Sequence, residues 1–349
     1  MHIIDHNGFR ETIWERNDFD VKWVHETLKG ETLAVFGYGT QGQAQANNLR
    51  DQSYPVILGL RSGPSYDRAL ADGWRPNENL FMLEEAAAKS SVWFYLLSDA
   101  GQKQQWPLLC PHLSSGKAIV FAHGFSIVYQ SMTDVIPPKD VDVLLIAPKG
   151  SGSTMRQEFQ KGQYIHAGIA VEQDATGRGM DRCQALAYAV GCGNLFATTM
   201  QREVICDLFG ERGSLLGAIY GMWLAQYEVL REHGHPPIES FTETVEEATQ
   251  SLYPLIAEFG IDGMYAKCSV TAQRGALDWY RRFHAALKPV FNELYQSVVN
   301  GTEAKRALDA NTSPDYRQRL TLELQKIASS EMWQMGRMVR SFRLPPSTT

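Results

Sequence analysis

The chain has 349 residues, 44% of them hydrophobic and 21% charged, so it is long enough and apolar enough for two domains with buried cores. The formal net charge is −6 and no basic block occurs, which argues against a nucleic-acid partner. No apolar run approaches the roughly 20 residues that span a bilayer, and the first residues lack a signal-peptide pattern, so we expect a cytoplasmic protein without membrane contact. The five cysteines are widely spaced and odd in number, which indicates reduced core thiols.

Short apolar runs alternate with helix-like segments in the first half of the chain. They occupy residues 32–36, 55–60, 92–97, 118–123, 142–148 and 164–171. Continuous apolar runs of this length are typical of strands buried on both faces, and their alternation with helices indicates a parallel, doubly wound sheet. We therefore predict an α/β domain of the Rossmann type over residues 1–199.

The first predicted strand runs directly into a glycine-rich stretch, GYGTQG, which a helix and a second strand follow. In this context Gly37 permits a tight turn, Gly39 leaves room for a pyrophosphate, and Gly42 lets helix and strand pack closely. The alternative is a structural turn between a strand and a helix. We predict a dinucleotide site whose contacts come from Gly37, Tyr38, Gly39, Thr40, Gln41 and Gly42.

The end of the second predicted strand bears on which dinucleotide binds. NAD enzymes commonly place a carboxylate there, whereas this chain has Arg61 followed by Ser62 and Ser65, with no carboxylate until Asp67. Guanidinium and hydroxyl donors suit a 2′-phosphate, so we predict NADPH. The alternative is that Arg61 is simply a solvated residue at the end of a strand. Two more predicted cofactor contacts follow the strand at 92–97, namely Ser98 and Asp99.

From about residue 200 the pattern changes to long stretches with helical periodicity, such as 215–234 and 241–260. Each ends at a glycine, Gly234 or Gly260, which closes a helix well because glycine tolerates positive φ. The second domain, residues 200–349, is therefore predicted to be all-α.

Two pairs of carboxylates stand four residues apart in these helices: Asp207 with Glu211, and Glu243 with Glu247. On a helix each pair projects from one face, where like charges repel unless a cation lies between them. Four such groups could hold one or two Mg²⁺ ions, which prefer oxygen ligands. The alternatives are a solvated helix face and, for Glu243, a capping box with Ser240.

Several motifs taken together resemble the ketol-acid reductoisomerase (acetohydroxy acid isomeroreductase) family. The stretches GYGTQGQAQANNLRD, FAHGF, APKGSG, DLFGERG and ETVEEATQSLYPL occur in the family's order, and the resemblance covers residues 30–342. The helical half is most similar to the fungal form. No transit segment precedes it, so we expect a bacterial or already processed chain. A single helical unit places the chain with the family's short class, whose helical domain is knotted.

The resemblance implies a reaction and a set of site residues. Two Mg²⁺ ions and NADPH would convert 2-acetolactate or 2-aceto-2-hydroxybutyrate, first by alkyl migration and then by hydride reduction. A homodimer or a higher assembly is implied, because the second carboxylate pair of the short class comes from the partner subunit. The implied metal ligands are Asp207, Glu211, Glu243 and Glu247; the implied catalytic residues are His123, Lys149 and Glu211; and Ser269 would bind the substrate.

Two segments depart from the family's commonest pattern. The stretch LLSDA stands where many members have LLPDE, and PKGSGSTMR where many have PKGPGH. Both bear on cofactor preference and rate. Two other functions stay open at this stage: a metal-independent dehydrogenase of the β-hydroxyacid type, and a catalytically silent NADPH-binding protein.

Overall fold

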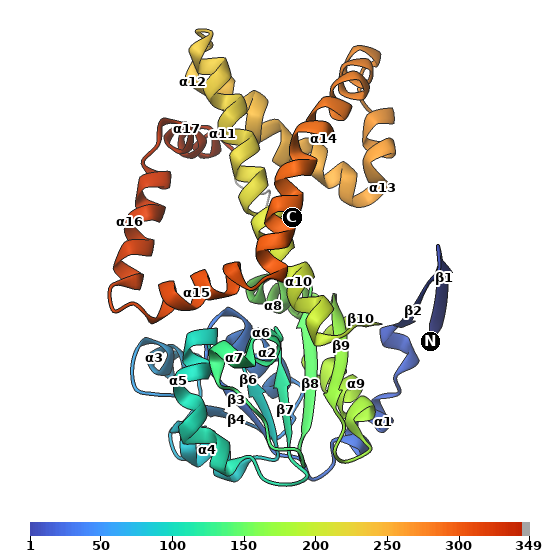
Figure 1. The fold of residues 1–349 in the computed structure, drawn as a ribbon, viewed down its shortest axis with the longest axis vertical. Helices are drawn as coiled ribbons and strands as arrows, with labels where there is room; N and C mark the ends of the chain where they lie inside the picture. The colour runs from blue at the N-terminus through green and yellow to red at the C-terminus, as the bar shows by residue number, and fades with distance from the viewer. Residues whose placement is uncertain (344–349) are drawn as a thin grey trace. The chain divides into compact units, whose positions relative to one another are not determined.

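One ten-stranded sheet organises the first of two units into which the chain divides, Met1–Cys206 and Asp207–Thr349, in a computed structural model that describes residues 1–343 (Figure 1). The strands are β1 (His2–His6), β2 (Phe9–Trp14), β3 (Leu33–Phe36), β4 (Val56–Gly59), β5 (Leu80–Phe81), β6 (Val92–Tyr95), β7 (Ala118–Phe121), β8 (Asp142–Pro148), β9 (Ile165–Gln173) and β10 (Cys192–Ala197). Their spatial order is β1-β2-β10-β9-β8-β7-β6-β3-β4-β5.

Six of these strands reproduce the doubly wound arrangement. β5, β4, β3, β6, β7 and β8 are mutually parallel, and their order is that of a dinucleotide-binding sheet. The predicted α/β fold is therefore confirmed, with one correction to its parallel sheet. β9 runs antiparallel to β8, and β1 and β2 extend the sheet as an antiparallel hairpin. An apolar run shows that a strand is buried, but not in which direction it pairs.

Both faces of the central strands are buried, as their apolar runs predict. In β6, Val92 and Phe94 join one core cluster while Trp93 and Tyr95 join the other. This alternation follows from the two-residue period of a strand. Helices lie on both faces of the sheet (Figure 1). The cluster containing Val92 is covered by α1 (Val21–Thr27), α2 (Thr40–Asp51), α3 (Pro64–Ala71), α8 (Gly152–Gln160) and α9 (Gly179–Ala189); the opposite cluster by α4 (Leu83–Lys89), α5 (Asp99–Leu109) and α6 (Phe125–Val128).

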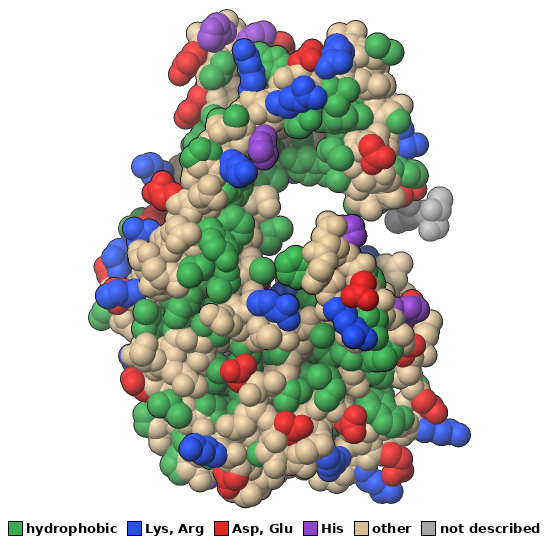
Figure 2. Space-filling model, turned by 45° about the vertical axis from the view of Figure 1, so that its right-hand side comes forward, with side chains coloured by type: hydrophobic (Ala, Val, Ile, Leu, Met, Phe, Trp, Pro, Cys, Tyr) green, Lys and Arg blue, Asp and Glu red, His purple; other side chains and the backbone are tan. Residues whose placement is uncertain are grey.

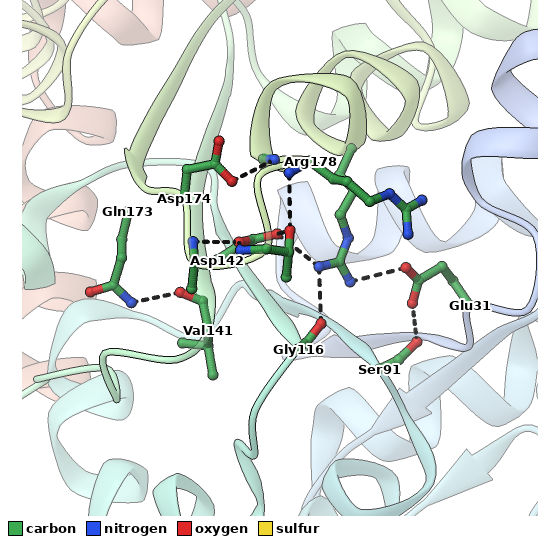
Figure 3. Close-up of polar contacts among 12 residues, drawn as sticks. Glu31, Ser91, Gly116, Val141, Asp142, Gln173, Asp174 and Arg178 are labelled. Carbon is green, nitrogen blue, oxygen red and sulfur yellow. Dashed lines mark hydrogen bonds and ion pairs between the residues drawn. The ribbon is translucent and has the colours of Figure 1, made fainter.

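A buried ionic network joins the starting ends of three strands (Figure 3). Asp142, the first residue of β8, is fully buried and accepts hydrogen bonds from the Thr176 amide and hydroxyl and from Arg182. Arg182 also pairs with Glu31 at 3.0 Å and donates to the Gly116 carbonyl. Glu31 precedes β3 and Gly116 precedes β7, so the network ties these strands together at their amino ends.

The second unit is helical throughout its described residues, as predicted. It begins within α10 (Met200–Gly210) and continues through α11 (Gly217–Glu232), α12 (Pro237–Phe241), α13 (Tyr253–Ala266), α14 (Val270–Val299), α15 (Thr302–Thr312), α16 (Tyr316–Ala328) and α17 (Glu331–Ser341). Three π-helical segments interrupt this series: η3 (Glu211–Leu215), η4 (Thr242–Glu246) and η5 (Ala248–Leu252). Among the described residues, no helix is long and apolar enough to span a membrane.

The glycines predicted to end helices both adopt positive φ. Gly234 follows α11 at φ +84°, which confirms the predicted stop, whereas Gly260, at φ +77°, produces a kink inside α13. The capping box predicted for Ser240 is wrong. Ser240 lies inside α12, where its hydroxyl donates to the Pro236 carbonyl, so Glu243 is not needed as a cap partner.

All five cysteines are free. Cys183 and Cys192 are buried, and burial raises the pKa of both thiols, so they are inert core residues as predicted. Cys206 is the exception to the predicted pattern, because it is exposed on α10.

Candidate active site

The glycine-rich turn lies where the strand order of the sheet reverses, between β3 and β6. Ligands of open α/β sheets bind at the carboxyl ends of the strands at this point. Gly37 follows β3 with φ +99°, and a Cβ there would come within 2.6 Å of the Leu96 carbonyl oxygen just after β6. A Cβ on Gly42 would lie 2.1 Å from the Gly37 carbonyl oxygen. The two glycines are therefore required for the backbone path itself.

Gly39 differs from these two glycines because the space next to its Cα is open. It is the N-cap of α2, and a Cβ added there would meet no atom within 4 Å. Among residues 1–343 no side chain caps the helix, so the first amide groups of α2 are available to an anion. Because Gly39 has no side chain and the first amide groups of α2 are unpaired, the turn has room and hydrogen-bond donors for the pyrophosphate of a dinucleotide.

The other residues of the turn take different positions. The Tyr38 side chain is buried, and its hydroxyl donates to Asp72 at 2.7 Å and accepts from the Trp74 indole. Only the backbone of Tyr38 is thus left for a cofactor. Gln41 donates to the Gly150 carbonyl at 3.0 Å, and Thr40 is exposed at the first turn of α2. The sequence predicts that Tyr38 contacts the cofactor, but it does not reveal that the Tyr38 ring is part of the core.

The residues predicted to distinguish NADPH follow β4 and β6. Arg61 is exposed just after β4, and Ser65 lies in the first turn of α3. Arg68, which sequence reasoning missed, donates to the Ser65 hydroxyl at 2.8 Å and to the Tyr38 carbonyl at 3.1 Å. It connects the glycine-rich turn with the first turn of α3. The residues after β6 begin a helix: Ser98 caps α5 by accepting from the Gly101 amide, and Asp99 is the first residue of α5.

Three polar side chains meet beyond the ends of β7 and β8. The Glu203 carboxylate contacts His123 Nδ1 at 3.1 Å and accepts from Lys149 Nζ at 2.8 Å. Only 3% of the Glu203 side chain is exposed, against 24% for His123 and 36% for Lys149. The buried glutamate thus holds two more accessible groups that can reach a ligand.

The local sequence explains how Glu203 reaches this position. His123 and Lys149 follow the buried strands β7 and β8, whose carboxyl ends share one edge of the sheet. A Cβ on Gly124 would lie 3.1 Å from the Met200 side chain and 3.2 Å from that of Val204. Because Gly124 has no side chain, the start of α10 can pack closely against it. This packing brings Glu203 to His123.

The charge state of Glu203 follows from its two partners. Burial alone would raise the pKa of this carboxyl, but the hydrogen bond and charge of His123, together with those of Lys149, outweigh burial and lower the pKa. Glu203 is therefore an ionised group inside the protein. Sequence reasoning missed it, although its place four residues before Asp207 puts Glu203, Asp207 and Glu211 at one-turn intervals.

The four predicted metal carboxylates all belong to the helical unit. Asp207 lies on α10, and Glu211 opens η3 with its carboxylate 3.8 Å from Arg212. Glu243 lies within η4 and Glu247 directly follows it; both are exposed. Within the described part of the chain, neither Glu211, Glu243 nor Glu247 belongs to a set of three metal-binding side chains within 4.8 Å of one another. One copy of the chain thus does not bring the two pairs together.

Ser269, predicted to bind substrate, is the N-cap of the longest helix. Its hydroxyl accepts from the Ala272 amide at 3.3 Å and is otherwise exposed at the start of α14. In a single chain its role is therefore that of a helix cap.

Comparisons with known proteins assign the chain to a family. The model described as "Acetohydroxy acid isomeroreductase, NADPH-binding domain" matches residues 27–195, and "Ketol-acid reductoisomerase, C-terminal domain" matches residues 200–344. The chain belongs to the ketol-acid reductoisomerase family. It is therefore an oxidoreductase of that family, and the resemblance drawn from its motifs is confirmed.

Individual relatives of this family member agree with the assignment. The mitochondrial ketol-acid reductoisomerases of Saccharomyces cerevisiae and Neurospora crassa are 52% and 51% identical, cover 97% and 98% of this chain, and are each matched over 86% of their own length. A solved NADH-preferring ketol-acid reductoisomerase from an uncultured archean superposes with a TM-score of 0.84 at 29% identity, covering 96% of this chain and 100% of its own.

These relatives correct the predicted cytoplasmic location. The fungal proteins are named as mitochondrial, whereas the lack of a membrane-spanning apolar run and of a signal-peptide pattern led us to expect the cytoplasm. The prediction was wrong because neither feature distinguishes a cytoplasmic protein from a mitochondrial one.

Proposed function

We propose that this ketol-acid reductoisomerase uses NADPH and two Mg²⁺ ions to isomerise and reduce a 2-acetolactate-type substrate. The observation that carries the proposal is the cluster in which buried Glu203 holds Lys149 and His123 at the carboxyl edge of the sheet that also carries the glycine-rich turn. The substrate has a carboxylate, a tertiary alcohol and a ketone. An anionic, oxygen-rich molecule of this kind suits a fixed ammonium group beside a hydride donor.

NADPH is proposed over NADH from the residues after β4. Arg61 and Ser65 offer donors to a 2′-phosphate, and the carboxylate that commonly binds a ribose hydroxyl at this place is missing from the strand end. The archaeal relative is described as NADH-preferring, so family membership alone does not decide the cofactor. When bound, NADPH would supply the hydride that reduces the new ketone.

The carboxylates fit a magnesium site by their chemistry. Glu243 and Glu247 are exposed hard oxygen donors with no side-chain partner among the described residues, and Asp207 and Glu211 offer the same ligand type. Bound Mg²⁺ would supply a Lewis acid for the ketone and the alcohol. We assign proton transfer at the alcohol to Glu211 and Lys149, and substrate binding to Ser269. Glu203 orients Lys149 and His123.

We also propose a dimer, from the exposed apolar surface of the helical unit. Large apolar side chains on α14 are exposed in one copy, and Figure 2 shows hydrophobic side chains on the surface of the helical unit. The exposed apolar residues of α14 include Trp279, Tyr280, Phe283 and Val290. None of the 13 residues of α16 is buried, although a helix of that length is marginal in water by itself. We infer that a second copy covers these surfaces and contributes Glu243 and Glu247 to the site.

The test is NADPH oxidation by the purified chain with 2-acetolactate, first with Mg²⁺ and then with excess EDTA. We expect turnover that needs Mg²⁺ and runs faster with NADPH than with NADH. Turnover that survives EDTA would favour metal-independent hydride transfer. NADPH binding with no turnover under either condition would favour the catalytically silent alternative.

A further inference from the structure

Three glutamates stand close together in the segment that carries the second carboxylate pair, but they differ in environment. Glu243 and Glu247 are exposed, whereas Glu246, between them in sequence, is buried. Glu246 Oε1 accepts from Arg343 Nε at 2.9 Å and lies 2.8 Å from Arg343 Nη2. Two nitrogen atoms of the guanidinium thus contact the same carboxylate oxygen. This ion pair joins the segment after α17 to η4.

Helix α17 is held at its other end as well. Glu331, its first residue, accepts from Tyr227 and from Arg231 of α11, each at 2.7 Å. Between the two ends α17 packs on a small core that contains Phe241 and Val245. A Cβ on Gly336 would lie 2.6 Å from the Phe241 ring, so the glycine allows the helix to approach the start of η4 closely.

These contacts fix the orientation of η4 about its own axis. Phe241 and Val245 face the small core, and Glu246 is tied to Arg343, which leaves Glu243 and Glu247 on the exposed side. A π-helical turn lacks the regular i to i+4 bonding of an α-helix, so side-chain anchors matter more for its orientation. Arg343 also balances the charge of Glu246 beside two other carboxylates. Without the arginine, Glu246 would be a buried charge without its partner.

We propose that the Arg343–Glu246 ion pair is a positioning device for the Glu243 and Glu247 carboxylates. It rests on the proposed magnesium role of those two residues. Neither Arg343 nor Glu246 is among the proposed ligands; the pair acts by holding the turn that presents the ligands. Residues outside the ligand set commonly affect metal affinity in this way, by about 10- to 100-fold.

The experiment uses the chain of 349 residues with Arg343→Gln and measures Mg²⁺ binding by calorimetry and NADPH binding by fluorescence. We expect the Mg²⁺ dissociation constant to rise by about tenfold while NADPH affinity stays within about twofold. In turnover assays the concentration of Mg²⁺ needed for half-maximal rate should rise more than kcat falls. Arg343→Lys, which keeps the charge, should recover part of the loss.

The matched control is Arg231→Gln, which removes an arginine–glutamate pair at the opposite end of the same helix. We expect it to lower thermal stability but to leave Mg²⁺ affinity within about twofold. An equal loss of Mg²⁺ affinity in both variants would overturn the proposal, since α17 would then act only by docking. If Arg343→Gln does not fold, Glu246→Gln gives the same test with little change in shape. Unchanged Mg²⁺ binding in that variant would also overturn the proposal. A wild-type chain that binds no Mg²⁺ would instead refute the proposed function.

Discussion

Replacement by alanine should affect stability differently at two glycines of the same turn. Gly42→Ala would place a Cβ 2.1 Å from the Gly37 carbonyl oxygen, a clash with backbone that cannot be relieved by a side-chain rotation. We expect it to lower the unfolding free energy by about 1–3 kcal/mol and to distort the turn. Gly39→Ala meets nothing within 4 Å, so stability should stay within about 0.5 kcal/mol of the wild type.

The readout that separates these glycines is NADPH affinity beside thermal stability. In Gly39→Ala the methyl group would occupy the open side of the turn where we expect the pyrophosphate, so NADPH should bind at least about tenfold more weakly in a protein of normal stability. NADPH binding that survives Gly39→Ala unchanged would mean that the cofactor approaches elsewhere. The turn would then have only a structural role.

Glu203 predicts how stability changes with pH. Its pKa is lowered below the ordinary 4.5, so the ionised carboxylate stabilises the folded state above the unfolded-state pKa. That contribution is lost as pH falls through the lower, folded-state pKa. We expect the wild-type unfolding free energy to decline as pH falls below about 4.5, because the unfolded state then takes up a proton that the folded state binds only at lower pH. Chemical denaturation at a series of pH values measures this decline.

The matched variant for this pH effect is Glu203→Gln, which keeps the shape and removes the charge. At pH 7 it should be less stable by about 1–3 kcal/mol, and its stability should change less with pH in the acid range. Parallel pH curves for the two proteins would show that other carboxylates cause the acid sensitivity. Glu203 would then contribute little to it.

At the scale of elements, the amino and carboxyl edges of the sheet should separate stability from function. Asp142 and its partners lie at the amino edge (Figure 3), whereas the glycine-rich turn, His123 and Lys149 lie at the carboxyl edge. Asp142→Asn leaves the buried Arg182 guanidinium with a weaker partner, so we expect a loss of about 3 kcal/mol in unfolding free energy. The KM for NADPH should remain unchanged.

A surface pair provides the comparison for Asp142. Lys305 and Asp309 form an exposed ion pair on α15, and Asp309→Asn should cost less than about 0.5 kcal/mol. Equal effects of the two substitutions would show that the buried network does not hold the strand ends together. A changed KM for NADPH in Asp142→Asn would show that the two edges are coupled.

The elements themselves show what sequence reasoning could and could not find. The run at 142–148 coincides with β8, because a strand buried on both faces has no polar positions to obscure it. The sequence does not predict β1 or β5, for two different reasons. All five residues of β1 are exposed, and β5 has only two residues. The run at 164–171 was recognised as a strand, but only long-range pairing decides that β9 is antiparallel to β8.

The residues of the candidate site likewise divide into those that a local motif predicts and those that only the folded structure brings together. Gly37 and Gly42 were found because a short-range motif dictates their backbone. Glu203 was missed because its importance arises from the approach of α10 to Gly124, and no local pattern records that approach. Ser240 and Glu243 were given a capping box on spacing alone, although helix α12 begins earlier, at Pro237.

At the scale of the whole molecule, the proposed dimer makes a prediction that two inactive proteins can test. Glu211→Gln removes a ligand from the first carboxylate pair, and Glu243→Gln removes one from the second, so each variant alone should be inactive. If each site takes its first pair from one subunit and its second pair from the other, a mixed dimer contains one site with both pairs intact. Half of randomly reassociated dimers are mixed and one of their two sites is intact, so activity should recover to about a quarter of wild type.

The recovery should appear only after the two variants have been dissociated together and reassociated, and size-exclusion chromatography should show the dimer before and after. A mixture of the same proteins without dissociation is the control, because exchange of subunits is then prevented by the large apolar surface that the dimer covers. If both pairs of each site come from one subunit, every mixed dimer still has two damaged sites and no activity returns. Mg²⁺ binding to the reassociated dimers gives a second measure, since the intact site should bind the metal while neither variant alone does. Recovery on reassociation would also explain why one copy of the chain keeps Glu243 and Glu247 exposed and apart from Asp207 and Glu211.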